Sequence, residues 1–253
     1  MTMKPRFHRP LFVIHHRTTC PGLLGQLATK WYGGYQTLYA PDGGFPDPSD
    51  ICAPVIVMGG LMSSNDSSFQ VKAELAWIEK LMGQDKSILG ICLGAQMMAK
   101  VLGQQVGPCP DGFLECGYVP LVRHEAHLPS HVYQWHREGM VWDQHRTPEA
   151  KVLATSQWRN GACQAFQVGS SLGLQFHPEV TLDRIQYWTQ RDAEDLVKPG
   201  ARPPQTHLED HVRYGDAVNA WMTDYLHQLW QVKQSNETHP SSCLPINLNL
   251  SVA

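Results

Sequence analysis

The stretch Gly90–Gln96, which reads GICLGAQ, decides the fold of this 253-residue chain. The short apolar run Ser87–Ile91 that leads into it is typical of a buried strand. The segment Leu93–Leu102 that follows is rich in Leu, Ala, Met and Gln, which favour a helix. Glycines stand two residues before and two residues after Cys92, and a missing β-carbon lets a strand and a helix cross closely. The pattern therefore predicts a sharp strand-to-helix turn with Cys92 at its apex.

The position of Cys92 at this turn indicates a chemical role. A thiol at a helix N-terminus lies at the positive end of the helix dipole, which favours the thiolate. Hydrolases with a Gly-x-Ser-x-Gly motif use the same kind of turn to present a nucleophilic serine. A small, buried and inert side chain is the more common interpretation of an arbitrary cysteine. The two glycines and the change from strand to helix favour a nucleophile here.

A candidate base for this nucleophile lies in the segment Ser171–Glu179, which reads SLGLQFHPE. An apolar strand runs into His177, and Pro178 disfavours helical geometry at the residue before it. Because residues i and i+2 of an extended chain project to the same side, Glu179 is expected to face the same way as His177. A carboxylate in that position orients an imidazole that accepts a proton from a thiol. Taken alone, the segment also fits a histidine at a strand end beside a solvated glutamate.

The segments before Cys92 alternate between strand and helix patterns. Strands are expected at Leu11–His16, Tyr35–Ala40, Val55–Met58 and Ser87–Ile91, and helices at Leu23–Trp31 and Ser68–Met82. This order implies a parallel sheet covered by helices on both faces, with a functional site at the carboxyl ends of its strands.

After Cys116 the pattern changes to short strands with few helix signals. The expected strands are Tyr118–Val122, Val132–Trp135, Val152–Thr155, Ala165–Val168 and Leu172–Phe176, and helices are expected at Leu182–Val197 and His207–Val232. These segments together predict an α/β fold, a flavodoxin-like three-layer sandwich with a central, mostly parallel sheet and an added antiparallel β section. We expect one domain over residues 1–233 and a polar C-terminal tail over residues 234–253.

The composition argues against several classes of function. The net charge is −3 and Lys and Arg are scattered, so no basic stripe indicates nucleic-acid binding. The apolar runs fall far short of the roughly 20 residues that cross a bilayer. Seven cysteines without close pairing, and no signal peptide, predict a reducing, cytoplasmic location. The 13 histidines, with His15 and His16 in the densest group, lack a metal-binding spacing, so we expect neither a metal nor another cofactor.

The two motifs around Cys92 and His177 together resemble those of the class I (triad) glutamine amidotransferases. The segments YQWH at residues 133–136 and QAF at residues 164–166 also look like that family. The stand-alone type, similar to the glutaminase domain of GMP synthase, fits best, over about residues 11–188. The resemblance implies a Cys-His-Glu triad that hydrolyses the side-chain amide of glutamine through a thioester. Cys92 would be the nucleophile, His177 the base and then the acid, and Glu179 the orienting carboxylate.

The same resemblance supplies an oxyanion hole. The residue after the nucleophile opens the helix, which leaves the backbone N–H of Leu93 free to donate. The family carries Gly-Gly-Pro after a neighbouring strand, and its second glycine gives the other N–H. This chain has Gly59-Gly60-Leu61 there, so Gly60 matches and the proline is missing. An ordinary strand-to-loop turn explains the two glycines equally well from the residues alone.

Residues for the amino-acid end of the substrate are less well defined. Gln96 looks like a family residue that contacts this end, and a surface glutamine of a helix is its alternative. His136 matches a segment that reads Trp-His-Gly-Asp in relatives, but Arg137 and Glu138 replace the last two residues here. Arg137 is a candidate to contact a substrate carboxylate or to narrow the pocket, and exposure to solvent is the usual fate of an arginine.

The sequence thus predicts a glutaminase that releases glutamate and ammonia. A γ-glutamyl peptidase with the same triad is one alternative, and a partner-dependent or inactive regulatory binding subunit is another. Since the chain contains no synthetase segment, ammonia is expected to pass to a separate synthetase subunit or to solvent.

Overall fold

A parallel sheet forms the centre of the computed structural model, which describes residues 6–109, 112–156 and 161–236. Its strands are β1 (Leu11–Ile14), β2 (Gln36–Tyr39), β3 (Val55–Val57), β4 (Ile88–Ile91) and β12 (Ser171–Leu174). They lie in the order β2-β1-β3-β4-β12, and each neighbouring pair is parallel. The α/β fold with a mostly parallel sheet is therefore confirmed.

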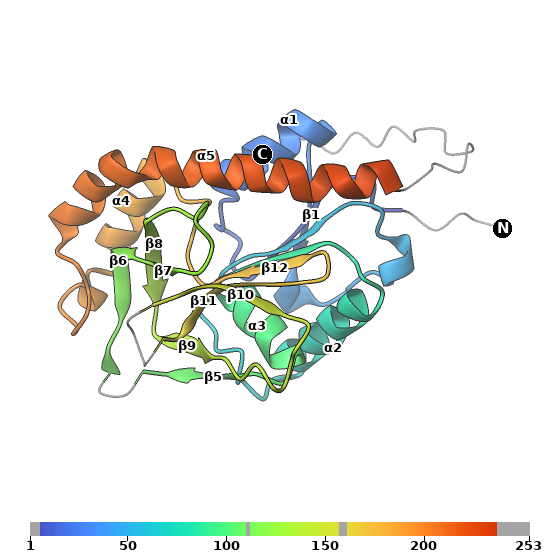
Figure 1. Cartoon of the computed structure of the whole chain (residues 1–253), viewed down its shortest axis with the longest axis horizontal. Helices are drawn as coiled ribbons and strands as arrows, with labels where there is room; N and C mark the ends of the chain where they lie inside the picture. Colours follow the sequence, from blue (N-terminus) through green and yellow to red (C-terminus); the bar gives the residue numbers. More distant parts are fainter. Residues whose placement is uncertain (1–5, 110–111, 157–160, 237–253) are drawn as a thin grey trace.

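Helices cover this sheet on two faces (Figure 1). The covering helices are α1 (Gly22–Tyr32), α2 (Phe69–Gly83), α3 (Leu93–Val101), α4 (Leu182–Arg191) and α5 (Pro204–Asn236). Because side chains alternate along a strand, Phe12 of β1 packs with residues of α1, α4 and α5, whereas Val13 packs with residues of α2 and α3. Two separate apolar cores result, one on each face of the sheet, as in a three-layer sandwich.

Antiparallel strands extend the sheet beyond β12. They are β11 (Cys163–Val168), β10 (Lys151–Thr155), β7 (Val122–Arg123), β9 (Glu138–Val141) and β5 (Gln105–Pro108). A separate two-stranded ribbon joins β6 (Glu115–Pro120) to β8 (His131–His136). The sequence pattern did not predict β5 and β9, which pair with each other across a long separation in the chain. The last strand of this part also differs from expectation, since β12 pairs antiparallel with β11 but parallel with β4.

The C-terminal helices deviate from their expected bounds. Helix α4 ends at Arg191 instead of Val197, and a short 3₁₀ turn at Ala193–Asp195 follows it. Asp195, at the end of this turn, is buried and bonds to Arg137 and Trp135. Helix α5 starts at Pro204, because proline is tolerated in the first turn of a helix, and it runs beyond residue 233 to Asn236.

Residues 237–253 of the expected C-terminal tail lie outside the described residues. The division into a domain and a tail therefore stays a prediction. Within the described ranges no helix is both long enough and apolar enough to cross a membrane.

Two glycines allow α3 to cross the sheet at close range. A β-carbon on Gly94 would lie 2.1 Å from the carbonyl oxygen of Val57 in β3. A β-carbon on Gly90 would lie 2.6 Å from Sδ of Met98 and 2.7 Å from the backbone nitrogen of Ala95. The expectation that these glycines serve a strand–helix crossing is confirmed by this packing.

We predict that Gly94→Ala lowers the free energy of unfolding by about 1–3 kcal/mol, since the added methyl group forces α3 away from β3. Gly83→Ala is the matched control, because Gly83 ends α2 and nothing lies within 4 Å of an added β-carbon. That variant should be neutral or more stable by up to about 1 kcal/mol. Urea unfolding of both variants measures the difference, and equal stabilities would contradict the prediction.

Candidate active site

Cys92 occupies the apex of the turn between β4 and α3, in a strained conformation. Its φ is 50° and its ψ is −103°, a region that residues with a β-carbon rarely adopt. Two backbone hydrogen bonds hold it there, from Cys92 N to the carbonyl of Leu174 at 2.8 Å and from Gln96 N to the carbonyl of Cys92 at 3.0 Å. The strand on one side and the helix on the other thus fix the position of the thiol.

His177 and Glu179 follow β12 and form a buried pair. The Nδ1 atom of His177 lies 2.8 Å from Oε1 of Glu179, and each side chain is only 6% exposed. The backbone is fixed from two other elements: His177 N donates to the carbonyl of Tyr133 at 2.9 Å, and Leu23 N donates to the carbonyl of Glu179 at 3.1 Å. The i, i+2 relation predicted from the sequence is present in this geometry.

The imidazole of His177 also hydrogen-bonds to Cys92 on its other side. Burial alone lowers the pKa of His177, but the charges of the Glu179 carboxylate and the Cys92 sulfur outweigh burial and raise it to about 10. An imidazolium is therefore favoured at neutral pH. A thiol, an imidazole and a carboxylate are thus joined in the order that nucleophilic catalysis requires.

Gln175 lies beside Cys92, and the sequence pattern gave it no role. Its Nε2 is 3.7 Å from Sγ of Cys92, and its Oε1 accepts from Nε2 of Gln96 at 3.2 Å. The same nitrogen of Gln96 also donates to the carbonyl of Glu138 at 2.9 Å. Gln96 is 4% exposed and therefore does not lie on the helix surface. The position of Gln175 two residues before His177, on the same side of an extended strand, was the available signal.

His136 lies behind this group of amides. Its Nδ1 is 2.9 Å from the carbonyl oxygen of Glu138, the same oxygen that Gln96 contacts. Its Nε2 is 3.1 Å from Oε2 of Glu115, which also accepts from Nε2 of Gln164 at 2.8 Å. Gln96 and His136 therefore converge on one backbone carbonyl.

The Gly59-Gly60 loop at the end of β3 lies directly against the side chains of Cys92 and His177. A β-carbon on Gly59 would lie 3.0 Å from Cε1 of His177 and 3.5 Å from Cβ of Cys92. A β-carbon on Gly60 would lie 2.8 Å from Cδ2 of Leu93, the first residue of α3. The loop and the helix N-terminus thus meet beside the thiol, where the oxyanion donors were expected.

Comparisons with known proteins identify the family of this chain. The model of the glutamine amidotransferase class-I family matches residues 47–190, more than half of the chain. The chain belongs to the class-I glutamine amidotransferase family. A subunit of the glutamine-hydrolyzing GMP synthase of Ignicoccus hospitalis is 30% identical over 142 residues, which are 53% of this chain and 71% of that protein.

Two other curated relatives resemble this amidotransferase over different shares of their length. A putative glutamine amidotransferase-like protein, YfeJ of Salmonella typhimurium, is 28% identical over 183 residues, 64% of this chain and 71% of that protein. The GMP synthase of Thermus thermophilus is 34% identical over 107 residues, which are 40% of this chain but only 20% of that enzyme.

Solved structures share the fold of this amidotransferase. A glutamine amido transferase from Methylobacillus flagellatus superposes with a TM-score of 0.80 at 22% identity, over 94% of this chain and all of the other. A glutamine amidotransferase from Thermotoga maritima gives 0.75 at 24% identity, over 89% of this chain and 99% of that one.

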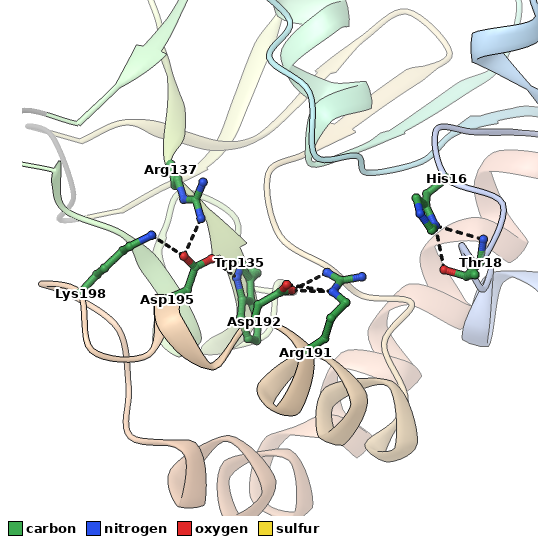
Figure 2. Close-up of polar contacts among 8 residues, drawn as sticks. All are labelled: His16, Thr18, Trp135, Arg137, Arg191, Asp192, Asp195 and Lys198. Carbon is green, nitrogen blue, oxygen red and sulfur yellow. Dashed lines mark hydrogen bonds and ion pairs between the residues drawn. The ribbon is translucent and has the colours of Figure 1, made fainter.

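Arg137 is held in a cluster around a buried carboxylate (Figure 2). Its Nη2 lies 2.5 Å from Oδ1 of Asp195, and Asp195 also accepts from Lys198 Nζ at 2.6 Å and from Trp135 Nε1 at 3.1 Å. Burial alone raises the pKa of Asp195, but these hydrogen bonds outweigh it and lower the pKa below its usual value. The Arg137 side chain remains 60% exposed. The structure thus gives it a protein partner and does not place it among the contacts of Cys92.

The other cysteines of the amidotransferase lie in different surroundings from Cys92. All six that the structure describes are free, and Cys243 lies outside the described residues. Burial raises the pKa values of Cys116 and Cys163, which therefore stay protonated thiols. In the same described ranges no three His, Cys, Asp or Glu side chains group as a metal site requires. His16, from the densest histidine group, instead hydrogen-bonds to Oγ1 of Thr18 at 2.8 Å (Figure 2).

We predict that the imidazole of His177 stays protonated up to about pH 10 and that Glu179→Gln lowers this midpoint. The carboxylate stabilises the imidazolium, so its removal lets the proton leave at lower pH. An NMR titration of the histidine rings measures the midpoint, with the signal assigned by its loss in His177→Gln. Glu149→Gln, at an exposed position, is the control that should change nothing. An unchanged midpoint in Glu179→Gln would show that the carboxylate does not cause the raised pKa of His177.

Proposed function

We propose that this chain hydrolyses the side-chain amide of glutamine to glutamate and ammonia through a thioester on Cys92. The observation that carries the proposal is the position of His177, between the carboxylate of Glu179 at 2.8 Å and the sulfur of Cys92. Membership of the amidotransferase family supports the same reaction.

In the first half of the reaction the Cys92 thiolate attacks the amide carbon and a carbon–sulfur bond forms. The carbonyl oxygen takes the negative charge in a tetrahedral intermediate. The imidazolium of His177 then gives its proton to the amide nitrogen, the carbon–nitrogen bond breaks, and ammonia leaves. The γ-glutamyl thioester remains on Cys92, and the imidazole is neutral.

The second half consumes one water molecule. Neutral His177 accepts a proton from the water, and the oxygen attacks the thioester carbon. The carbon–sulfur bond breaks, glutamate leaves, and the imidazolium and the thiolate are restored. Glu179 orients the ring and stabilises its positive charge in both halves.

We assign the oxyanion hole to the backbone N–H groups of Gly60 and Leu93. The contact between Gly60 and the Leu93 side chain supports this assignment, because it brings the loop and the helix N-terminus together beside Cys92. Preorganised donors of this kind are the largest single contribution in many acyl-transfer enzymes.

We further propose that Gln96, His136 and Arg137 recognise the amino-acid end of the substrate. Free α-amino and α-carboxylate groups need partners when they leave water. The Glu138 carbonyl that Gln96 and His136 share is a backbone acceptor near the thiol. Arg137 is bound to Asp195 and 60% exposed. Its guanidinium would contact the α-carboxylate of the substrate from the solvent side of the site.

We propose that the ammonia passes to a separate synthetase subunit or is released to solvent. The similarity to a protein named as one subunit of a GMP synthase supports a partner. The cytoplasmic location stays a prediction.

A glutamine-like diazoketone should label Cys92 ahead of the other cysteines, because Cys92 has an imidazolium beside it. Burial keeps Cys116 and Cys163 as thiols, which are poor nucleophiles. Peptide mapping by mass spectrometry locates the adduct, and Cys92→Ser is the control that should abolish labelling. An adduct found mainly on Cys20, Cys116 or Cys163 would count against the assignment.

Ammonia release from glutamine should be lost in Cys92→Ala and nearly lost in His177→Ala, by roughly a hundredfold or more, because triad members act as a unit. Glu179→Gln should be milder. A panel of glutamine, asparagine and γ-glutamyl peptides, with the isolated chain, measures the substrate class. Preference for the peptides would make the protein a γ-glutamyl peptidase. Labelling of Cys92 without any turnover would make it a partner-dependent or regulatory subunit.

A further inference from the structure

A buried histidine–glutamate pair lies behind the Gly59-Gly60 loop, outside the triad. His15 follows β1 and Glu74 lies on the inner side of α2, and their side chains are 1% and 2% exposed. The Nε2 atom of His15 is 3.0 Å and 3.2 Å from the two carboxylate oxygens of Glu74. The Nδ1 atom of His15 is 3.3 Å from the carbonyl oxygen of Gly59.

The two partners of His15 fix the orientation of its ring. A backbone carbonyl only accepts hydrogen bonds, and so does an ionised carboxylate. The Nδ1–H of His15 therefore donates to the Gly59 carbonyl, while Nε2 lies against the Glu74 carboxylate, which holds the ring in this orientation.

The contact with Gly59 orients a peptide group of the active site. The carbonyl of Gly59 and the N–H of Gly60 belong to one planar peptide unit and point in opposite directions when it is trans. Holding the oxygen toward His15 therefore turns the Gly60 N–H away from His15. The Gly59 end of this unit lies against Cys92 and His177.

The loop needs such a restraint because its sequence provides little stiffness. Two successive glycines leave the peptide free to rotate, and Leu61 stands where proline would fix a dihedral angle. A buried ion pair is weak evidence for stability by itself, since desolvation offsets much of its attraction. The second ring nitrogen of His15, Nδ1, points at the carbonyl of Gly59, and this contact gives the pair a more specific role.

We propose that His15, held by Glu74, is a positioning residue that fixes the Gly59–Gly60 peptide with the Gly60 N–H directed at the substrate oxyanion. The proposal rests on the proposed acyl-transfer function of Cys92. It assigns to α2 and β1 a part in catalysis that neither the triad nor its motifs contain.

The test compares His15→Gln, Glu74→Gln and the double variant with wild type. Because removal of one oxyanion donor costs about 10²–10³ in kcat, misdirection of the donor should lower kcat for glutamine by about 10–100-fold. KM should change much less, because the interaction develops in the transition state. The double variant should be no worse than His15→Gln, since the two residues act through one contact.

Alkylation of Cys92 by iodoacetamide distinguishes a positioning role from a merely structural one. Structural damage would slow both turnover and alkylation, whereas misdirection of the Gly60 N–H should slow turnover alone. Alkylation displaces iodide at a saturated carbon and forms no oxyanion, so its rate should stay within about twofold of wild type in each variant. His211→Gln is the matched control for a lost histidine hydrogen bond, since His211 Nδ1 lies 2.8 Å from Tyr118 Oη. It should leave both kcat and alkylation unchanged.

Unchanged kcat in folded variants, or a parallel fall in kcat and alkylation, would overturn the proposal. Glu74→Gln carries the test if His15→Gln does not fold. The aldehyde analogue of glutamine separates this proposal from the proposed function, because it adds to Cys92 and leaves an oxygen in the oxyanion hole without turnover. If the wild type binds the aldehyde but does not hydrolyse glutamine, only the glutaminase assignment fails. If the variants bind the aldehyde as tightly as the wild type does, the proposed role of His15 is overturned.

Discussion

The close contact between α3 and the backbone of β3 is the constraint on which the rest of the site depends. Gly94 lies against the carbonyl of Val57 with no room for a β-carbon. This contact brings the first turn of α3 to the end of β3, where the chain continues as Gly59-Gly60. The strained backbone of Cys92 is a consequence, because the chain must reverse from β4 into a helix that crosses so near. Cys92 and the Gly59-Gly60 loop are therefore placed by one packing arrangement.

A second layer of order comes from buried polar groups that connect separate elements. Gln175 at the end of β12 contacts the thiol, Gln96 of α3 contacts Gln175, and both Gln96 and His136 contact the carbonyl of Glu138. The carboxylate of Glu138 in turn accepts from Ser63 Oγ at 2.8 Å and 2.9 Å, which ties the loop after Gly60 to β9. In a low dielectric each of these bonds is costly to lose. The antiparallel section thus helps to hold the parts of the site together.

The sequence was most informative where the determining contacts are local. The turn at Cys92, the i, i+2 relation of His177 and Glu179, and the strands up to β4 all follow from patterns within a few residues. Strands β5 and β9 escaped prediction because their pairing partners are distant and their own residues are mixed in polarity. The His15–Glu74 pair escaped for the same reason, since nothing in either segment specifies the other. Asp195 shows how tertiary contacts override a helical pattern, because its bonds to Arg137 and Trp135 accompany the early end of α4.

The backbone hydrogen bond between Leu23 and Glu179 has a consequence for the order in which the site forms during folding. A β-carbon on Gly22, the first residue of α1, would lie 1.8 Å from the carbonyl oxygen of Glu179, so the start of α1 and the end of the triad motif are packed without space between them. Contacts between such distant parts of a chain form late in folding, after loop closure. While the chain is being synthesised, Cys92 emerges long before its carboxylate partner can dock. The pairing of His177 with Glu179 beside Cys92 is therefore completed only when the start of α1 has packed against the segment after β12.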